Sequence, residues 1–279
     1  MPLVSTREML SKALREGYAV GAFNVENMEL AQAVVNAAEQ LNAPVIVQTT
    51  TSTLKYAPPE VFYGMAAALA KACRAPVALH LDHGASLNLL TRCRDAGYTS
   101  LMFDGSKLSL EENTALSAQA VALAGDIPVE AELGQVGGKE DEHEGSLQLT
   151  DPHVAARFVK ATGIASLAVA IGTAHGVYKG VPHLDIARLH AIHDMTPIPL
   201  VLHGTSGVPE EQVRACVQLG ICKVNYATDL RQTYTAAVRA WLEGNPDGFD
   251  PKPFGAAARA AVTDVVMARM RLVGSEGKG

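Results

Sequence analysis

The sequence of 279 residues lacks several features that would place it in a specialised class of protein. Its four cysteines form no Cys-x-x-Cys pair, so we expect reduced thiols and no disulfide framework. No apolar run reaches the roughly 18 residues that a membrane span requires. The first residues, MPLVSTREML, do not show the basic and apolar regions of a secretory leader. These absences predict a cytoplasmic protein that does not bind a membrane.

The chain also has no excess of positive charge. Its 29 acidic and 23 basic residues give a net charge of −6, which argues against nucleic acid as a partner while leaving room for a local basic pocket that holds a small anion. Hydrophobic residues make up 48% of the chain and charged residues 19%, which is ample for a core and excludes a disordered chain. We expect residues 1–279 to form a single domain.

What the sequence does contain is a short apolar run followed by a longer amphipathic stretch, repeated eight times. The runs are nearly continuous in aliphatic and β-branched residues, which is typical of parallel strands buried on both faces. They span residues 19–25, 44–50, 76–82, 99–104, 128–134, 166–172, 199–204 and 222–228. This alternation predicts an α/β protein with a (β/α)8 TIM barrel. An open doubly wound sheet is the alternative, but eight units in so few residues favour closure.

The stretches between the runs have helical periodicity. Proline and acidic residues mark helix starts near residues 152 and 209, and glycines at positions 97, 125, 163 and 220 mark helix ends. The predicted helices are 28–41, 59–73, 87–96, 110–124, 152–162, 185–193, 209–219 and 229–242. A final helix at 256–271 is expected to pack on the barrel or on a second subunit.

Three of the predicted strands lead to a histidine that is followed at once by glycine: His83, His175 and His203. The active sites of barrel enzymes lie at the carboxyl ends of the strands, so these side chains are expected to converge. Catalytic zinc is typically held by three protein ligands with one position left open. The pattern therefore predicts a Zn²⁺ site. The other histidines lack this pattern and are interpreted as structural; they are His80, His143, His153, His183, His190 and His193.

Further polar residues end the other strands, and their common position on one rim indicates a binding site. They are Asn24, Thr50, Asp104, Glu132, Asn225 and Thr228. Glycines near strands six and seven, together with Lys179 and Ser206, are expected to hold a phosphate group. The acidic, glycine-bounded segment 137–145 is either a solvated mobile loop or a lid that carries Glu140 over the substrate.

Taken together, these residues resemble the class II, metal-dependent ketose-bisphosphate aldolases, and within them the fructose- and tagatose-bisphosphate branch. The matching segments cover nearly the whole chain: 18–24, 44–47, 80–84, 129–134, 137–138, 140–141, 171–176, 202–204 and 223–225. The resemblance implies a (β/α)8 barrel, a catalytic zinc ion and dihydroxyacetone phosphate as the common three-carbon product. We also expect a homodimer or homotetramer.

The resemblance also implies roles for particular residues. His83, His175 and His203 match the zinc ligands, Asp82 the acid/base at the C4 hydroxyl, and Glu140 a loop glutamate that moves a proton at C3. Asp104 and Glu132 match positions that hold a second, non-catalytic metal in some members. Arg259 matches an arginine that meets the distal phosphate across a dimer interface. The positions that match the dihydroxyacetone phosphate site are Gly176, Lys179, Gly204, Thr205, Ser206, Asn225, Ala227 and Thr228.

Two departures from the family pattern leave the substrate open. The segment after strand seven reads His-Gly-Thr-Ser-Gly, and Ala227 stands where fructose-bisphosphate enzymes often carry asparagine or aspartate. Fructose 1,6-bisphosphate, tagatose 1,6-bisphosphate and another phosphorylated ketose, such as a 6-phospho-deoxy-ketogluconate, all remain candidates. A monovalent cation such as Na⁺ or K⁺ at the phosphate loop also remains open.

Three alternatives to a metal-dependent aldolase are disfavoured. A Schiff-base aldolase needs a desolvated lysine at a strand tip, and the one obvious candidate, Lys223, lies inside the eighth strand. A metal-dependent barrel hydrolase would carry a His-x-His pair after the first strand, which is missing. A non-catalytic barrel subunit would be expected to have lost Asp82 or a histidine ligand. The sequence therefore predicts zinc-dependent aldol cleavage of a ketose 1,6-bisphosphate to dihydroxyacetone phosphate and glyceraldehyde 3-phosphate.

Overall fold

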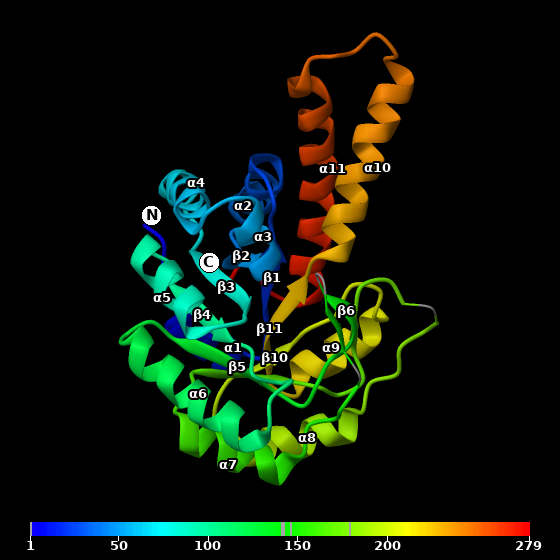
Figure 1. Ribbon diagram of the computed structural model, residues 1–279. Helices are drawn as coiled ribbons and strands as arrows, with labels where there is room; N and C mark the ends of the chain where they lie inside the picture. Colours follow the sequence, from blue (N-terminus) through cyan, green and yellow to red (C-terminus); the bar gives the residue numbers. More distant parts are fainter. Residues whose placement is uncertain (1, 141–142, 146, 179) are drawn as a thin grey trace.

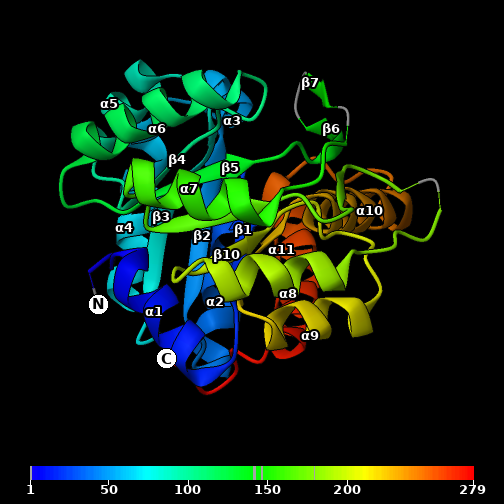
Figure 2. The same cartoon turned by 90° about the horizontal axis from the view of Figure 1, so that it is seen from below.

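Eight parallel strands close into a barrel, and helices surround it (Figures 1 and 2). The computed structural model describes residues 2–140, 143–145, 147–178 and 180–279, with the backbone alone for 139–140 and 143–145. Around the ring the strands follow the order β1-β11-β10-β8-β5-β4-β3-β2. They are β1 Val20–Asn24, β2 Val45–Thr50, β3 Val77–Gly84, β4 Ser100–Phe103, β5 Val129–Leu133, β8 Ser166–Val169, β10 Leu200–Leu202 and β11 Ile221–Tyr226. The predicted TIM barrel is confirmed, and the open sheet is excluded.

All nine predicted helices are present, and two more were missed. The predicted ones are α2 Met28–Leu41, α4 Pro59–Ala72, α5 Leu87–Ala96, α6 Leu110–Ala124, α7 Pro152–Thr162, α8 Ile186–Met195, α9 Glu210–Gln218, α10 Thr228–Gly244 and α11 Pro251–Leu272. The missed ones are α1 Thr6–Glu16 and α3 Thr51–Tyr56. Helix α1 begins at a capping Ser5 and ends at Gly17, which adopts a left-handed conformation with φ of 68°.

Helix α1 closes the end of the barrel at which the strands begin. Its Met9, Leu10 and Ala13 form one buried cluster with Val20 and Ile46 of the strands. The backbone N–H of Val4, just before the helix, donates to the carbonyl of Val77 at the start of β3 (2.9 Å). Because α1 fills this end with apolar side chains, a functional site is left to the opposite end, where the strands finish.

The middle of the barrel interior is polar. Side chains alternate along each strand, so Leu79 and Leu81 of β3 pack against the surrounding helices while His80 points into the barrel. Glu130 and Lys223 lie beside it, and both are almost fully buried. Buried charges of this kind are costly unless they are paired. Glu130 and Lys223 therefore depend on each other and on polar neighbours inside the barrel.

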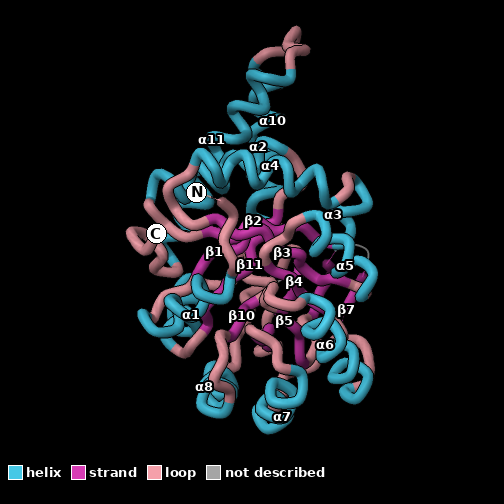
Figure 3. Tube along the Cα trace, turned by 90° about the vertical axis from the view of Figure 1, so that its left-hand side faces the viewer, coloured by secondary structure: helices cyan, strands magenta, loops and turns pink. Residues whose placement is uncertain are grey.

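Helices α10 and α11 form an antiparallel hairpin that extends well beyond the barrel (Figures 1 and 3). At its far end the rings of Trp241 and Phe254 lie 5.9 Å apart, and Phe249 in the turn is 92% exposed. The base of the hairpin packs on α2, and α10 begins directly at the end of β11. The hairpin thus connects the rim of the barrel with a distant apolar tip.

All four cysteines are buried. Desolvation raises the pKa of Cys93, Cys216 and Cys222 to about 12, and it also raises the pKa of Cys73. Such thiols stay protonated at neutral pH and behave as small apolar side chains. Among the described residues, no helix combines the length and the apolar character needed to cross a membrane.

Candidate metal and active site

His83 occupies a strained position at the carboxyl end of β3. Its φ is +48°, in the left-handed region that residues other than glycine rarely adopt. The predicted strand ends at Asp82, whereas β3 continues through His83 to Gly84. Such backbone strain is found mainly where a side chain has to be aimed for function. Here it directs the imidazole toward the middle of the rim.

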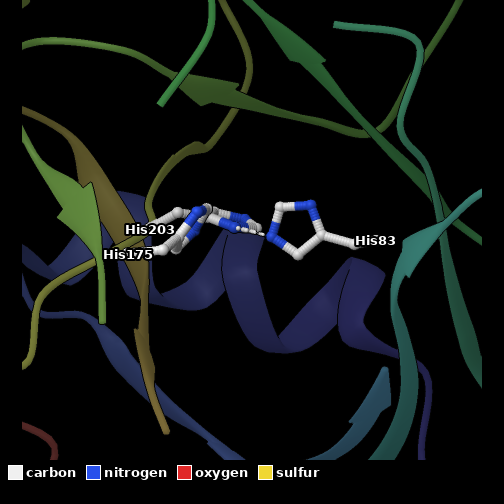
Figure 4. Close-up of side chains that lie close together, drawn as sticks. All are labelled: His83, His175 and His203. Carbon is white, nitrogen blue, oxygen red and sulfur yellow. Dashed lines mark hydrogen bonds between the residues drawn. The ribbon is translucent and has the colours of Figure 1, made fainter. Parts of the chain in front are cut away.

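The three predicted histidines converge from separate segments of the chain (Figure 4). His203 follows β10 directly, whereas His175 lies in a short extra strand, β9 (Ala174–His175), six residues beyond the end of β8. The Nε2 atom of His83 lies 2.9 Å from the Nδ1 atom of His203. One ring nitrogen from each of the three histidines lies within 4.8 Å of the others. The rings are close to perpendicular, with His83 facing the other two.

Carboxylates orient two of these imidazoles from behind. The Nδ1 atom of His83 is 2.8 Å from Asp104 Oδ2, and the Nε2 atom of His203 is 2.8 Å from Glu130 Oε1. Burial alone would raise the pKa of Asp104, but hydrogen bonds from His83 and Ser106 hold it below its usual value. An ionised carboxylate only accepts hydrogen bonds, so each histidine donates its rear proton to it.

With the rear nitrogens protonated, His83 Nε2 and His203 Nδ1 each keep a lone pair, and these two atoms face each other across the site. Two lone pairs at 2.9 Å repel unless a cation lies beside them. A histidine that donates one nitrogen to a carboxylate and offers the other to a metal is the common arrangement in metalloproteins. Three neutral imidazoles are a suitable donor set for zinc. The residues therefore fit a catalytic divalent metal ion.

The two predicted second-metal residues lie on the rear side of His83. Glu132 Oε2 is 4.0 Å from His83 Nδ1, and one donor atom from each of His83, Asp104 and Glu132 lies within 4.8 Å of the others. The Oε1 atom of Glu132 accepts from the backbone N–H of Val136 at 3.3 Å. The structure thus brings Asp104 and Glu132 together as an acidic pair behind the first cluster.

Asp82 is held by side-chain amides. Its Oδ2 accepts from Asn24 at 3.0 Å and from Gln48 at 3.3 Å, and its Oδ1 accepts from Asn225 at 3.1 Å. Gln48 also donates to Asn24 Oδ1 at 2.7 Å, which fixes the orientation of that amide. Neutral donors position the carboxylate without supplying a full opposite charge. The three amides therefore fix the orientation of the Asp82 carboxylate at the edge of the rim.

A pocket opens next to Asp82 and contains most of the predicted substrate-binding residues. Its lining residues are Asn24, Asp82, His175, Gly176, Gly204, Thr205, Ser206, Asn225, Ala227, Thr228 and Arg231. Thr50 is buried beside it and caps α3 by accepting from the Thr53 N–H. Arg259 lies elsewhere on α11, where it donates to Gln32 at 2.6 Å. Lys179 and the side chain of Glu140 lie outside the described residues.

Tyr178 was not among the predicted site residues, and its hydroxyl connects two loops of the pocket. Its hydroxyl accepts from the Ala174 N–H and donates to the Gly204 carbonyl, both at 2.7 Å. Burial raises the pKa of Tyr178, so the hydroxyl keeps the proton that it donates. The loop carrying His175 is thereby fixed to the loop that follows His203.

Residues 137–140 and 143–145 form two short strands, and the first of them reaches the histidine cluster. Strand β6 (Gly137–Glu140) pairs with β7 (His143–Gly145) and, on its other side, with β9, so that Gly138 is opposite His175. A Cβ atom on Gly138 would lie 2.2 Å from the His175 carbonyl oxygen, and its φ is +83°. Only glycine fits there without displacement. The segment anticipated as a loop or lid therefore starts as a strand against a candidate ligand.

Comparison with known proteins identifies the family. The family model described as class-II fructose-bisphosphate aldolase matches residues 4–278. The chain belongs to this family. It is therefore an aldolase, a lyase that carries out aldol cleavage of a ketose bisphosphate, with dihydroxyacetone phosphate as product. Metal dependence is general in the class-II family, and the histidine cluster described above is a suitable place for the ion.

Solved aldolase structures resemble this one over almost the entire chain. The YdjI aldolase of Escherichia coli K12 is 34% identical with a TM-score of 0.88, covering 99% of both chains. A candidate fructose-1,6-bisphosphate aldolase of Coccidioides immitis is 30% identical with a TM-score of 0.90, covering 97% of this chain and 96% of that one. The fructose-bisphosphate aldolase of Campylobacter jejuni shares the fold, with 24% identity, a TM-score of 0.85, and coverage of 100% and 97% respectively.

In this class II aldolase Lys223 is not placed to form a Schiff base. Its ammonium group lies 2.9 Å from Glu130 Oε2, and its side chain is 1% exposed. In the described part of the chain it does not line the pocket beside Asp82. A nucleophilic lysine must reach the substrate as a free amine. Lys223 is instead half of an ion pair inside the barrel.

Proposed function

We propose that this chain is a zinc-dependent aldolase that reversibly cleaves a ketose 1,6-bisphosphate, tagatose or fructose 1,6-bisphosphate, to dihydroxyacetone phosphate and glyceraldehyde 3-phosphate. The observation that carries the proposal is the cluster of His83, His175 and His203 beside Asp82 at the edge of a glycine-rich pocket. One end of this site suits a cation and the other suits a phosphate group, and the general base lies between them.

The three histidines would hold the zinc ion through the nitrogens that face the centre of the rim. When bound, the ion supplies Lewis acidity that stabilises negative charge on the oxygens of the substrate. Asp104 and Glu130 keep His83 and His203 in the required orientation. Asp104 and Glu132 are the residues that we assign to a second, non-catalytic metal, and a monovalent cation such as Na⁺ or K⁺ is assigned to the phosphate loop.

In this proposal Asp82 removes the proton of the C4 hydroxyl. The C3–C4 bond then breaks, C4 becomes the aldehyde carbonyl of glyceraldehyde 3-phosphate, and the electron pair passes to C3 and C2 as an enediolate. A proton delivered to C3 completes dihydroxyacetone phosphate, and we assign that delivery to Glu140. The amides of Asn24, Gln48 and Asn225 hold Asp82 in position for its transfer.

The phosphate of the three-carbon half is assigned to the pocket beside His175. Gly176 and Gly204 allow the backbone to approach closely, and Ser206 and Thr228 offer hydroxyl groups. Helix α10 begins at Thr228, so its N-terminal N–H groups and dipole favour an anion at this point. The other residues that we assign to this phosphate site are Thr205, Asn225, Ala227 and Lys179.

The aldehyde half is assigned to a second pocket that shares Arg231 with the first. Its lining residues are Glu26, Asn27, Ser52, Thr53, Tyr56 and Arg231. Arg231 forms an ion pair with Glu26 at 2.7 Å, which directs its guanidinium along this side of the rim. Thr50 supports the segment from which Ser52 and Thr53 project. Arg259 is assigned to the distal phosphate in the site of a neighbouring subunit.

We also propose that the chain is a single cytoplasmic domain that assembles into a homodimer or homotetramer. The projecting hairpin of α10 and α11, with Phe249 exposed at its tip, supports a contact between copies. Size-exclusion chromatography with light scattering tests this. Assembly should be weakened by Phe249→Ser, and a monomeric wild-type protein would contradict it.

The experiment that tests the activity is a coupled assay for triose phosphate release from fructose and tagatose 1,6-bisphosphate, with and without a chelator. Cleavage that the chelator abolishes and zinc restores is the expected result, and the ratio of the two rates identifies the preferred substrate. Cleavage that persists in the chelator would overturn the metal requirement. Zinc-loaded protein that cleaves neither compound would overturn the substrate assignment.

A further inference from the structure

Glu130 and Lys223 form a buried pair directly beneath His203. The two oxygens of Glu130 have different partners: Oε1 is 2.8 Å from His203 Nε2, and Oε2 is 2.9 Å from Lys223 Nζ. The three side chains are only 1–2% exposed. In the part of the chain that the structure describes, neither Glu130 nor Lys223 lines the substrate pocket. His203 is the candidate metal ligand that this pair contacts directly.

Around a neutral His203, the charged Glu130–Lys223 pair permits one hydrogen-bonding arrangement. The ammonium group of Lys223 only donates and the carboxylate of Glu130 only accepts, so His203 has to donate its Nε2–H. Its Nδ1 is then left with the lone pair, and this is the atom that lies 2.9 Å from His83 Nε2. A neutral imidazole carries one N–H, so the partner on one side determines the chemistry on the other.

We propose that Glu130 and Lys223 are positioning residues that fix His203 in the tautomer whose Nδ1 binds the metal. The inference rests on the metal site proposed above. Glu130 specifies which nitrogen carries the proton. Lys223 engages the second oxygen, which holds the Glu130 side chain in place and offsets part of the cost of burying its charge.

Replacing Glu130 by glutamine has a defined consequence. An amide has one accepting oxygen and one donating NH₂ group, and Lys223 attracts the oxygen. The NH₂ group then faces His203 Nε2, which has to accept, so the proton moves to Nδ1 and occupies the position of the metal. Loss of an outer-shell partner typically lowers metal affinity about 10–100-fold. We expect a decrease of that order in Glu130→Gln.

Removing the charge of Lys223 as well should reverse the effect. In Glu130→Gln/Lys223→Met the amide is free to rotate and present its oxygen to His203. Its NH₂ group can then donate to His80 Nε2, which lies 3.8 Å from the present position of Glu130 Oε2. Lys223→Met alone keeps the accepting carboxylate. It is therefore the matched control, with the original tautomer but an unpaired buried charge.

The experiment measures zinc affinity of chelator-stripped proteins by competition with a chromophoric chelator, alongside the tautomer of His203 from ¹⁵N-histidine NMR. We expect Nε2–H in wild type and in Lys223→Met, Nδ1–H with about 10–100-fold weaker binding in Glu130→Gln, and recovery of both in the double variant. Thermal melts show which variants are folded. A role limited to stability would lower melting temperatures without changing the tautomer.

Several outcomes would overturn the inference. They are a folded Glu130→Gln that binds zinc as tightly as wild type, a double variant that does not recover, and stripped wild-type protein with the His203 proton on Nδ1. The last measurement needs no variant, so the inference stays testable if a substitution prevents folding. Failure of the proposed metal site is distinguishable from these results, because wild type would then bind no zinc, or His83→Ala would bind it equally well.

Discussion

Asp82 and His83 are adjacent in the chain, yet opposite kinds of group hold their side chains. Three neutral amides donate to the carboxylate of Asp82, whereas the imidazole of His83 donates to the carboxylate of Asp104. The left-handed backbone at His83 turns the two side chains in different directions. The proton transfer proposed for Asp82 and the metal binding proposed for His83 can thus be tested separately at consecutive positions.

The first prediction follows from this separation. Asp82→Ala should retain zinc at the wild-type stoichiometry and lose about 10²–10⁴-fold in kcat, because it removes a general base and leaves the imidazoles in place. His83→Ala should lose both metal and turnover. Metal analysis and steady-state kinetics on the two variants check this. Equal loss of zinc from Asp82→Ala would assign Asp82 a structural role.

The second prediction concerns the glycine pair in β6. Gly138→Ala should displace His175 and lower zinc affinity, since its Cβ atom would lie 2.2 Å from the His175 carbonyl and its φ of +83° disfavours alanine. Gly137→Ala is the matched control, because its Cβ atom would meet Leu147 at an ordinary 3.5 Å. Zinc titration of both proteins is the measurement. Similar affinities would show that the β6–β9 pairing does not position the ligand.

The third prediction tests the bridge made by Tyr178. Tyr178→Phe removes one acceptor and one donor and leaves the Ala174 N–H and the Gly204 carbonyl without that partner. We expect a loss of about 1–3 kcal/mol in the free energy of unfolding. We also expect a higher KM, because both loops line the pocket proposed to bind the phosphate. Tyr63→Phe on α4 is the control for removal of a hydroxyl. An unchanged KM would restrict Tyr178 to stability.

The fourth prediction concerns pH. Burial, reinforced by the charge of Lys223, holds the pKa of His80 well below its usual value, so the folded protein keeps His80 neutral while the unfolded chain binds a proton below about pH 6.5. The free energy of unfolding therefore decreases as the pH falls below that value toward the pKa of His80 in the folded protein. This one group contributes a decrease of at most about 1.4 kcal/mol per pH unit.

Urea unfolding at a series of pH values from about 7.5 to 5.5 measures that slope. His80→Gln removes the titrating group and should give a shallower decrease in the free energy of unfolding. The control is His190→Gln, since His190 is 58% exposed and pairs with Asp194 on the surface. Equal slopes in wild type and His80→Gln would mean that His80 is protonated in the folded protein.

Much of the barrel was predictable because its signals are local. Helices α2, α5, α6 and α7 were placed to the residue, and each begins at a polar capping residue such as Asn27 or Ser109. Helix α1 was missed because its apolar stripe is short, although Ser5 and Gly17 marked its ends. Its function as the closure of the barrel depends on strands that follow later in the chain.

The site was predictable to the extent that it consists of strand tips. His83, His175 and His203 stood out because each precedes a glycine after a buried run. Gln48, Glu130 and Tyr178 did not, because their importance lies in partners from other elements: Asp82, His203 and Gly204 respectively. A polar residue inside an apolar run is the signal that marks the first two. Which residue it meets is decided by the closure of the barrel.

The four buried cysteines can serve as probes of local opening in the folded protein. Cys73 follows α4, Cys93 lies in α5, Cys216 in α9 and Cys222 in β11, so the thiols report on four different elements of the barrel. A maleimide reacts with an exposed thiolate, whereas a buried thiol is inaccessible to the reagent and stays protonated because its pKa is raised. The labelling rate of each thiol therefore measures how often the surrounding structure opens. Comparing the rates with and without zinc would show which parts of the barrel open less often when the metal is bound.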